Sequence, residues 1–388
     1  MDHRKHICII STAHPLDDVR VNSKVAQSFL ERGYRVSWVG PDLSLFSEKP
    51  YRDERISYFL ARPNKSRIDR LTAFRRILRA GRPVVDVDWY YAPSPDAAEA
   101  AISAAAGTNA KVLFDVLEDY HGTLLDRWVF GRKATLVRKY VRKRIARACA
   151  QSDLVMAVSD SIMRHYAADL PHTVVVRNCA PKWFADGPVA VESVIKGGTL
   201  RVIHGKIHPN NGTSVVLEAL AELSADNDIQ VVMFSRLLES EASLLTDFER
   251  RVEQLGVKDK LDLRDSVAHS EMPAIMRACD VGMVAYGRGL GEDSLPNRLF
   301  EYMAAGLAVL TPSYSIEIRN IVEAEQIGLS IDTERPEEIS RALSWFCEHP
   351  LETREMGKKA RDAFLRRHNW ETEFDRLIDA MERVEDGQ

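Results

Sequence analysis

The sequence alternates short apolar stretches with helical patterns, and it does so twice along its 388 residues. Strands that alternate with helices indicate a parallel sheet covered by helices on both faces, because each crossover places a helix against the sheet. The predicted strands of the first half are residues 6–11, 35–40, 84–92, 111–117 and 153–159. Those of the second half are residues 200–205, 229–235, 261–267, 281–286 and 308–312. We therefore predict an α/β chain of two doubly wound, Rossmann-like domains.

The length of the chain also favours two domains, because a single core seldom extends to 388 residues. Residues 173–198 contain Pro and Gly and show little periodicity, so the linker is placed within them, at 181–198. An N-terminal domain at 1–180 and a C-terminal domain that begins at 199 follow. Ligands on such sheets bind at the carboxyl ends of the strands, so two facing sheets would hold a ligand between them.

Several classes of protein are disfavoured by the composition. No apolar run approaches the roughly 20 residues of a membrane span, and the start of the chain does not have the pattern of a signal peptide. The five cysteines are scattered without metal-binding spacing, which fits reduced thiols in the cytoplasm. A nicotinamide oxidoreductase is disfavoured because residues 11–20, after the first strand, contain no glycine where G-x-G-x-x-G is expected.

Charge is distributed unevenly along the chain. Residues 1–185 carry a net charge of +10 and the remainder −14. Residues 127–150 contain nine basic residues and no acid, and residues 67–82 contain six arginines and one aspartate. Basic amphipathic helices suit an anionic membrane surface or an acidic carrier protein. A solvated helix face remains an alternative, whereas no motif indicates nucleic acid.

The stretch at 292–310 predicts an anion site at the start of a helix. Ser294 is a favourable N-cap, and Pro296 is favoured in a first turn. A helix that begins near residue 295 leaves the backbone N–H groups of 295–298 free, and such an N-terminus attracts phosphate. Arg298 adds a guanidinium suited to phosphate oxygens.

Two carboxylates complete this stretch. Glu301 can accept hydrogen bonds from two hydroxyl groups, as a ribose offers, and Asp293 stands before the helix and can accept from further hydroxyls. Together with the helix start, these groups predict a site for a nucleotide sugar.

The whole string at 293–306 resembles the acid-x7-Glu motif of retaining glycosyltransferases of family 4, with Asp293 and Arg298 at positions usually held by Glu and Lys. The resemblance covers nearly the whole chain and implies the GT-B fold. It also implies that residues 366–388 form a last helix that crosses back to the N-terminal domain, so that the C-terminal domain is residues 199–365.

The resemblance assigns residues to three sets. The catalytic set is Lys206, Arg298, Asp293 and Glu118. The donor-binding set is Glu301, Leu295, Pro296, Asn297, Val267, Asn211 and Gly205. The acceptor-side set is Leu16, Asp17, Arg20, Trp89, Tyr91, Leu117, Asp119 and His121.

Three features depart from the family pattern. Asn211 stands where a second cation usually grips the diphosphate, and Leu117 stands where a histidine usually lies near the sugar. The aromatic residues 89–91 replace a His-x-His and suggest a flat acceptor pocket, although strand-end aromatics in a core would explain them equally well. Asp86 and Asp88 form a DxD, but this pattern is short and common, so no metal or cofactor is expected.

These observations predict a glycosyltransferase that moves a hexose, N-acetylglucosamine or glucose, from a nucleoside diphosphate, with UDP preferred over GDP. The resemblance implies retention at the anomeric carbon without a metal ion. Expected acceptors are a lipid-linked or cell-surface glycan precursor, or a secondary metabolite on a carrier protein, with the enzyme cytoplasmic or peripheral on the inner face of the membrane. A sugar-nucleotide-binding protein without transfer and a GT-B epimerase are the alternatives.

Overall fold

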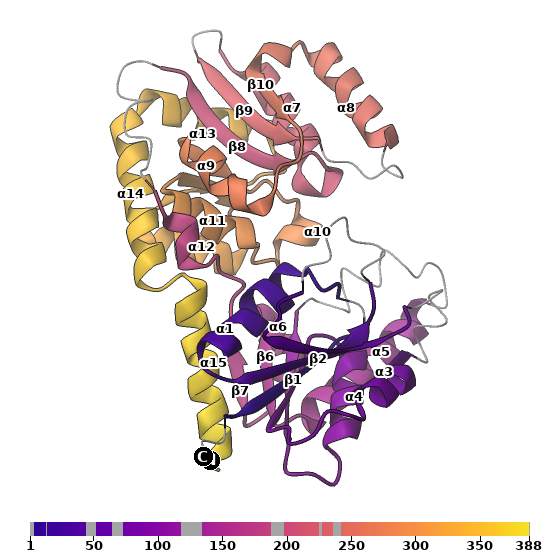
Figure 1. Ribbon diagram of the computed structural model, residues 1–388. Coiled ribbons are helices and arrows are strands. Elements are labelled where there is room, and N and C mark those ends of the chain that lie inside the picture. Colours follow the sequence, from indigo (N-terminus) through magenta and orange to yellow (C-terminus); the bar gives the residue numbers. More distant parts are fainter. Residues whose placement is uncertain are drawn as a thin grey trace. The chain divides into compact units, whose positions relative to one another are not determined.

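A computed structural model describes residues 4–12, 14–43, 52–63, 73–117, 134–187, 198–224, 227–235 and 242–387. The chain divides into two compact units, each built on a parallel sheet (Figure 1). Unit 1 is Met1–Asn178 with Glu371–Gln388, and unit 2 is Cys179–Trp370. The prediction of two doubly wound domains is confirmed. Residues 181–187 of the predicted linker belong to unit 2, because they form a short 3-10 helix, η4 (Lys182–Ala185), whose Phe184 lies in the core of that unit.

Unit 1 contains a seven-stranded parallel sheet in the order β3-β2-β1-β4-β5-β6-β7. Its strands are β1 (His6–Ile10), β2 (Arg35–Pro41), β3 (Ile56–Ala61), β4 (Trp89–Ala92), β5 (Lys111–Val116), β6 (Leu154–Ala157) and β7 (Thr173–Val175). Its helices are the π-helix η1 (Val19–Ala26), α1 (Gln27–Glu31), α3 (Ala73–Gly81), α4 (Pro95–Ala105), α5 (Ala134–Gln151), α6 (Asp160–Ala167) and α15 (Trp370–Glu385).

The alternation of side chains along the strands explains why both faces of this sheet are covered. Cys8 and Ile10 belong to the core formed with α3, α4 and α5, whereas Ile7 and Ile9, also fully buried, point to the opposite face. Figure 1 shows α1 and α15 on that opposite face. The rings of Phe29 on α1 and Phe374 on α15 meet edge to face, with centroids 4.9 Å apart.

Helix α15 is the last helix of the chain, and the predicted crossover is confirmed because its residues from Glu371 onward belong to unit 1. The carboxylate of Glu385 accepts from Lys5 Nζ at 2.6 Å and from the indole of Trp89 at 2.7 Å. Glu373, which is fully buried, accepts from the backbone N–H of Arg177 at 2.9 Å. These bonds tie the end of the chain to both ends of the first unit's sequence.

Three strands of unit 1 differ from the prediction. The predicted strand 84–92 is shortened to β4, because Asp86 has a φ of +54° and interrupts an extended backbone. Strands β3 and β7 were not predicted; they are the two edge strands of the sheet, and β7 has only three residues.

Unit 2 contains a six-stranded parallel sheet in the order β10-β9-β8-β11-β12-β13. Its strands are β8 (Leu200–Lys206), β9 (Ile229–Phe234), β10 (Leu261–Arg264), β11 (Val281–Met283), β12 (Ala308–Pro312) and β13 (Gly328–Ile331). Its helices are η4, η5 (Pro209–Asn211), α7 (Thr213–Glu222), α8 (Ala242–Leu255), η7 (Lys258–Lys260), η8 (His269–Glu271), α9 (Met272–Arg277), α10 (Arg288–Gly291), α11 (Asn297–Ala305), α12 (Ile316–Glu325), α13 (Pro336–Glu348) and α14 (Pro350–Arg366).

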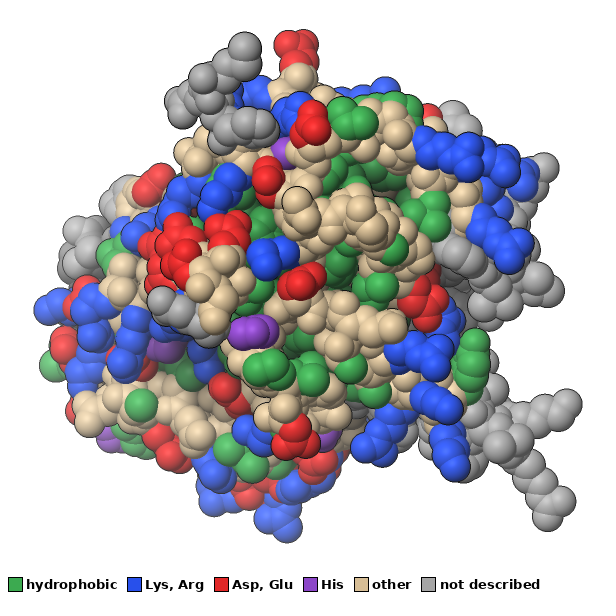
Figure 2. Space-filling view, turned by 90° about the horizontal axis from the view of Figure 1, so that it is seen from below, with side chains coloured by type: hydrophobic (Ala, Val, Ile, Leu, Met, Phe, Trp, Pro, Cys, Tyr) green, Lys and Arg blue, Asp and Glu red, His purple; other side chains and the backbone are tan. Residues whose placement is uncertain are grey.

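Helix α11 is the most deeply buried helix of unit 2, since every residue from Leu299 to Ala305 is buried. Its small residues allow close approach, and Gly282 on β11 is needed because a Cβ there would lie 2.2 Å from the Tyr302 ring. This packing fixes the first turn of α11 against the sheet. Figure 2 shows charged side chains of both signs scattered among polar and apolar surface on one face.

Candidate functional site

The first part of the site is the loop that joins β8 to α7. Gly205 has a φ of +94°, and a Cβ there would lie 3.3 Å from Nη1 of Arg298. Gly212 has a φ of +73°, and a Cβ there would lie 1.9 Å from the carbonyl oxygen of Ala285. Both positions therefore require glycine. The loop brings Lys206, which is partly buried, to the carboxyl end of β8.

The side chain of Asn211 shapes this loop from within. Its Nδ2 donates to the backbone carbonyl of Lys206 at 2.7 Å, and the side chain is buried. This bond occupies one of the two amide hydrogens. The prediction that Asn211 also binds the donor rests on the other hydrogen.

The second part of the site is the start of α11, which differs from the prediction. The helix begins at Asn297, and Pro296 occupies the N-cap position with an extended backbone, so Ser294 does not cap the helix. The carbonyl of Ser294 instead accepts a long bond from the hydroxyl of Ser315. Proline has no side-chain oxygen, so the N-cap residue makes no side-chain hydrogen bond to the first turn of α11.

Arg298 joins these two parts. Its Nη1 donates to the carbonyl of His204 at 3.1 Å, and its guanidinium lies over the ring of Tyr286, 5.2 Å from the centroid. Burial works against the charged form, but Tyr302, Tyr286 and Glu301 together raise the pKa of Arg298. No carboxylate among the described residues forms an ion pair with Arg298. A partly buried guanidinium without such a partner is suited to an external anion.

Glu301 lies one turn further along α11, and its side chain is buried. Its Oε1 accepts from Nε2 of His269 at 3.0 Å and from Nδ2 of Asn297 at 2.7 Å. No described residue forms a hydrogen bond with Oε2. This arrangement holds the carboxylate in one orientation and leaves an acceptor oxygen for a ligand.

His269 and Trp183 were not predicted as site residues. The ring of His269 lies edge to face with Trp183, centroids 6.1 Å apart, and tilted against Phe184 at 5.5 Å. Trp183 is 45% exposed, which is unusual for the largest apolar side chain. The only signal in the sequence was position, since His269 follows the predicted donor residue Val267 by two residues.

The remaining predicted donor residues lie close by in unit 2. Val267 and Leu295 are partly buried and pack against the core cluster that contains Leu299 and Phe300. Asp293 is exposed in the segment between α10 and α11. Leu295 and Val267 are thus anchored in the same core as α11.

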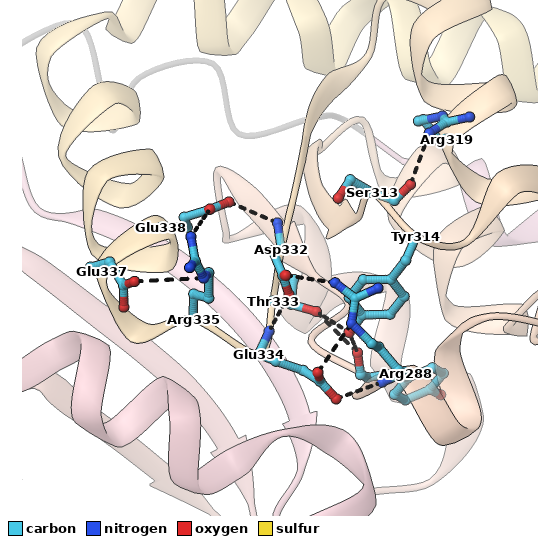
Figure 3. A network of polar contacts seen from close by, with 11 residues as sticks. Arg288, Ser313, Tyr314, Arg319, Asp332, Thr333, Glu334, Arg335, Glu337 and Glu338 are labelled. Carbon is cyan, nitrogen blue, oxygen red and sulfur yellow. Dashed lines mark hydrogen bonds and ion pairs between the residues drawn. The ribbon is translucent and has the colours of Figure 1, made fainter.

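A network of polar contacts holds the segment that leads to Asp293 (Figure 3). Arg288 on α10 donates from Nη2 to Asp332 at 2.7 Å and from its backbone N–H to Glu334 at 2.8 Å. Its guanidinium lies 4.6 Å from the centroid of the Tyr314 ring, and the Tyr314 hydroxyl is bonded to the carbonyl of Tyr286. The connection after β13 therefore holds both ends of the segment 286–288, since Thr333 also donates to the carbonyl of Tyr286. The ring of Tyr286 in this segment lies under the guanidinium of Arg298.

His204 lies directly beneath the loop and is fully buried. Thr213 Oγ1 donates to the carbonyl of His208, so the contact of 3.2 Å between Thr213 Oγ1 and His204 Nε2 requires the hydrogen on Nε2. Nδ1 is then an acceptor, and it has no partner among the described residues. Burial first, and then the charge of Arg298, lower the pKa of His204 to about 3. The imidazole is therefore neutral.

In unit 1, Arg20 and Tyr91 form a buried polar cluster rather than a surface. Nε of Arg20 donates to Asp115 at 3.0 Å, and the Tyr91 hydroxyl donates to the same carboxylate at 2.7 Å. Both Tyr91 and Asp115 are fully buried. These side chains are thus bonded to Asp115 within unit 1, and their place on the acceptor side stays a prediction.

The other acceptor-side predictions have mixed outcomes. Trp89 is fully buried at the amino end of β4, whereas ligands of such sheets bind at the carboxyl edge; its acceptor-side role stays a prediction. Leu16 is buried, whereas Asp17 is exposed and Leu117 is partly buried immediately after β5. Glu118, Asp119 and His121 lie outside the described residues.

The Asp86–Asp88 pair lies before β4, at the amino edge of the sheet. Oδ2 of Asp88 accepts from the backbone N–H of His6 at 2.7 Å. Within the described ranges, no three His, Cys, Asp or Glu side chains gather as a metal site requires. None of the described helices combines the length and the apolar character needed to cross a membrane.

Two family models match the chain. The model described as Glycosyltransferase Family 4 matches residues 19–180, and the model described as Glycosyl transferase-like matches residues 217–379. No curated protein sequence matches the chain significantly.

Solved structures that resemble the whole chain include three proteins. Sucrose-phosphate synthase from Thermosynechococcus elongatus aligns with a TM-score of 0.75 at 14% identity, covering 99% of this chain and 100% of that one. A glycosyltransferase from Rickettsia africae aligns at 0.73 and 15% identity, with 99% and 100% covered. Anabaena HepE in complex with UDP aligns at 0.71 and 14% identity, with 97% and 99% covered, and HepE has also been solved with UDP-glucose.

The shared architecture is the GT-B fold, which confirms the predicted fold class. With family models of glycosyltransferases matching both halves of the chain, the protein is a glycosyltransferase.

Proposed function

We propose that this glycosyltransferase transfers a hexose from UDP to an acceptor, with retention at the anomeric carbon and without a metal ion. The observation that carries the proposal is Arg298, a partly buried guanidinium that forms no ion pair with a described carboxylate. It lies beside the glycine loop of Lys206 and the uncapped start of α11. The diphosphate is proposed to bind these three elements, since cations and free N–H groups can stabilise the departing phosphate.

The ribose is proposed to bind Glu301. Its Oε1 is held by His269 and Asn297, so the carboxylate is oriented before a ligand arrives. UDP is favoured as the nucleotide because HepE, which shares the fold, has been solved with UDP and with UDP-glucose. Asp293, at the end of the segment held by Arg288, is proposed to contact the hexose.

Lys206, Arg298 and Asp293 are thus the proposed catalytic residues on unit 2, with Glu118 on unit 1. No side chain is assigned as nucleophile; the leaving phosphate is proposed to take the proton of the acceptor on the same face of the sugar. The acceptor is proposed to be a glycan precursor or a metabolite presented on a lipid or a carrier protein.

Arg298→Ala tests the proposal through binding of UDP measured by calorimetry in EDTA. Wild-type protein should bind UDP in EDTA, and the variant should bind about tenfold to a hundredfold more weakly, because hydrogen bonds to a charged group contribute about 1.5–3 kcal/mol. Arg354→Ala, on α14, is the matched control. Equal affinity in wild type and Arg298→Ala, or binding that requires a divalent metal ion, would contradict the proposal.

The alternative of a binding protein without transfer is supported by Leu117, which stands where the family has a histidine. The two functions differ in one measurable property. A transferase hydrolyses UDP-hexose slowly without acceptor, whereas a binding protein leaves it intact.

A further inference from the structure

Unit 1 contains a cavity of about 600 Å³ between its sheet and the helices α3 and α4. Buried side chains from three strands form its floor, and a buried side chain of α3 lies opposite them. The strand residues are Cys8, Ile10, Val39 and Tyr90, and the α3 residue is Ile77. The volume falls in the range of small-molecule sites, roughly 300–1,000 Å³, and the mostly apolar lining is also typical of them.

The cavity opens away from the proposed acceptor side. Its exposed lining residues lie on two connections, 82–87 and 108–110, which lead directly into β4 and β5. Both connections therefore lie at the amino edge of the parallel sheet. A GT-B enzyme uses the carboxyl edges, so the cavity is separate from the transfer site.

Tyr90 supplies a polar group that the protein leaves unused. The side chain is 8% exposed and lines the cavity, and no described residue forms a hydrogen bond with its hydroxyl. The hydroxyl oxygen is accessible rather than buried, so it can form a hydrogen bond with a ligand partner in the cavity. A ligand oxygen in the cavity would supply that partner.

One cation, Arg82, lines the cavity, and two further arginines lie near it. Arg82 lines the cavity and Arg79 precedes it by one turn on α3; both are exposed, and neither forms an ion pair with a described residue. Nη2 of Arg35 donates to the carbonyls of Val85 and Asp86 at the same rim. Asp86 is the one acid among the lining residues. Arg79 and Arg82 together outnumber this acid, so the end of α3 favours an anion above an apolar interior.

We propose that this cavity binds a single-chain anionic amphiphile, with its apolar chain on the floor and its anionic head group at Arg79, Arg82 and the Tyr90 hydroxyl. The apolar chain of the ligand replaces water at Cys8, Ile10, Val39 and Ile77. The head group of the ligand accepts hydrogen bonds that the protein does not otherwise make. Such a ligand occupies unit 1 without entering the transfer site.

Decanoate is the probe, and calorimetry on the full-length protein is the measurement. One decanoate should bind per chain, and decyltrimethylammonium, with the same chain length and a cationic head, should not. Arg79→Glu combined with Arg82→Glu should weaken decanoate binding at least about tenfold. Tyr90→Phe, which removes only the hydroxyl, should weaken it about tenfold. Lys358→Glu combined with Arg383→Glu, at exposed positions away from the cavity, is the matched control and should leave binding unchanged.

Ala104→Phe places a ring in the cavity and should abolish binding, with circular dichroism to verify folding. If this variant does not fold, the surface reversal and Tyr90→Phe decide the question. Absence of decanoate binding to wild type, or equal binding of the cationic amphiphile, would overturn the proposal. Binding to anionic vesicles without uptake of decanoate would assign the arginines to a membrane surface instead, and would also overturn it.

Discussion

Glu301 and His204 show how single residues prepare the site in opposite ways. Glu301 is a buried acid with two donors on one oxygen, so it is oriented and remains an acceptor. His204 is a buried base next to Arg298, and it remains neutral so that no second positive charge is buried under the loop. The sequence indicated Glu301 through its spacing from Asp293. It did not indicate His204, since nothing in a strand sequence shows which charge will lie beside it.

The low pKa of His204 predicts a pH dependence of stability. The unfolded histidine has a pKa near 6.5, and the folded one titrates at about 3. Between these values only the unfolded state binds the proton, so stability falls as pH decreases from about 6.5, by up to roughly 1.4 kcal/mol per pH unit. His204→Gln should show a shallower loss than wild type between pH 6.5 and 4 in urea unfolding. His172→Gln should keep the wild-type slope; equal slopes in wild type and His204→Gln would contradict the pKa.

At the scale of elements, the β8–α7 loop and the start of α11 could be predicted as parts of one site, but their geometry could not. The predicted cap at Ser294 was wrong, because Pro296 occupies that position and the segment before it is held by Arg288 through Asp332 and Glu334. These acids follow β13, about forty residues later in the sequence. The apolar pattern and the residue propensities of a sequence describe neighbours along the chain. The contact of Arg288 with Asp332 and Glu334 depends instead on the order of the strands in the sheet.

Gly212→Ala tests the close approach of this loop to β11. The new Cβ would lie 1.9 Å from the carbonyl of Ala285, and φ is +73°. Gly256→Ala is a matched control, since φ there is +65° but nothing lies within 4 Å. The control should lose about 1 kcal/mol of unfolding free energy from backbone strain, and Gly212→Ala should lose more and also weaken UDP binding. Equal losses in urea unfolding would show that the loop moves to accept the methyl group.

For the whole molecule, the fold class and the two parallel sheets could be predicted from the repeated pattern of apolar strands and helices, and the last crossover from the resemblance to known glycosyltransferases. The sequence was not sufficient to predict the surroundings of Trp89 and Tyr91. An aromatic run near a strand end is compatible with a pocket or with a core, and the partners that decide, Glu385 and Asp115, come from elsewhere in the chain. The cavity behind α3 likewise depends on helix placement, which no local pattern specifies.

The uneven charge of the whole chain leads to the last prediction, which concerns α5. Arg142, Lys143 and Arg147 are exposed there and form no ion pair with a described residue, whereas Arg144 is paired with Glu99 at 2.7 Å. In Figure 2, Lys and Arg side chains gather in groups at the right of the view. If α5 attaches the enzyme to an anionic membrane, each of these cations contributes about 1 kcal/mol to the free energy of membrane binding.

Reversing Arg142, Lys143 and Arg147 to glutamate should therefore weaken co-sedimentation with anionic vesicles more than about a hundredfold. The matched control reverses three exposed cations elsewhere, Lys258, Lys358 and Arg383, and so changes the net charge equally. Added salt should weaken binding of the wild type in the same way, because attraction between exposed charges is screened beyond about 8 Å at physiological ionic strength. UDP binding should be unaffected, since the proposed donor site lies in unit 2. If the α5 reversal and the control bind vesicles equally, overall charge rather than α5 determines attachment.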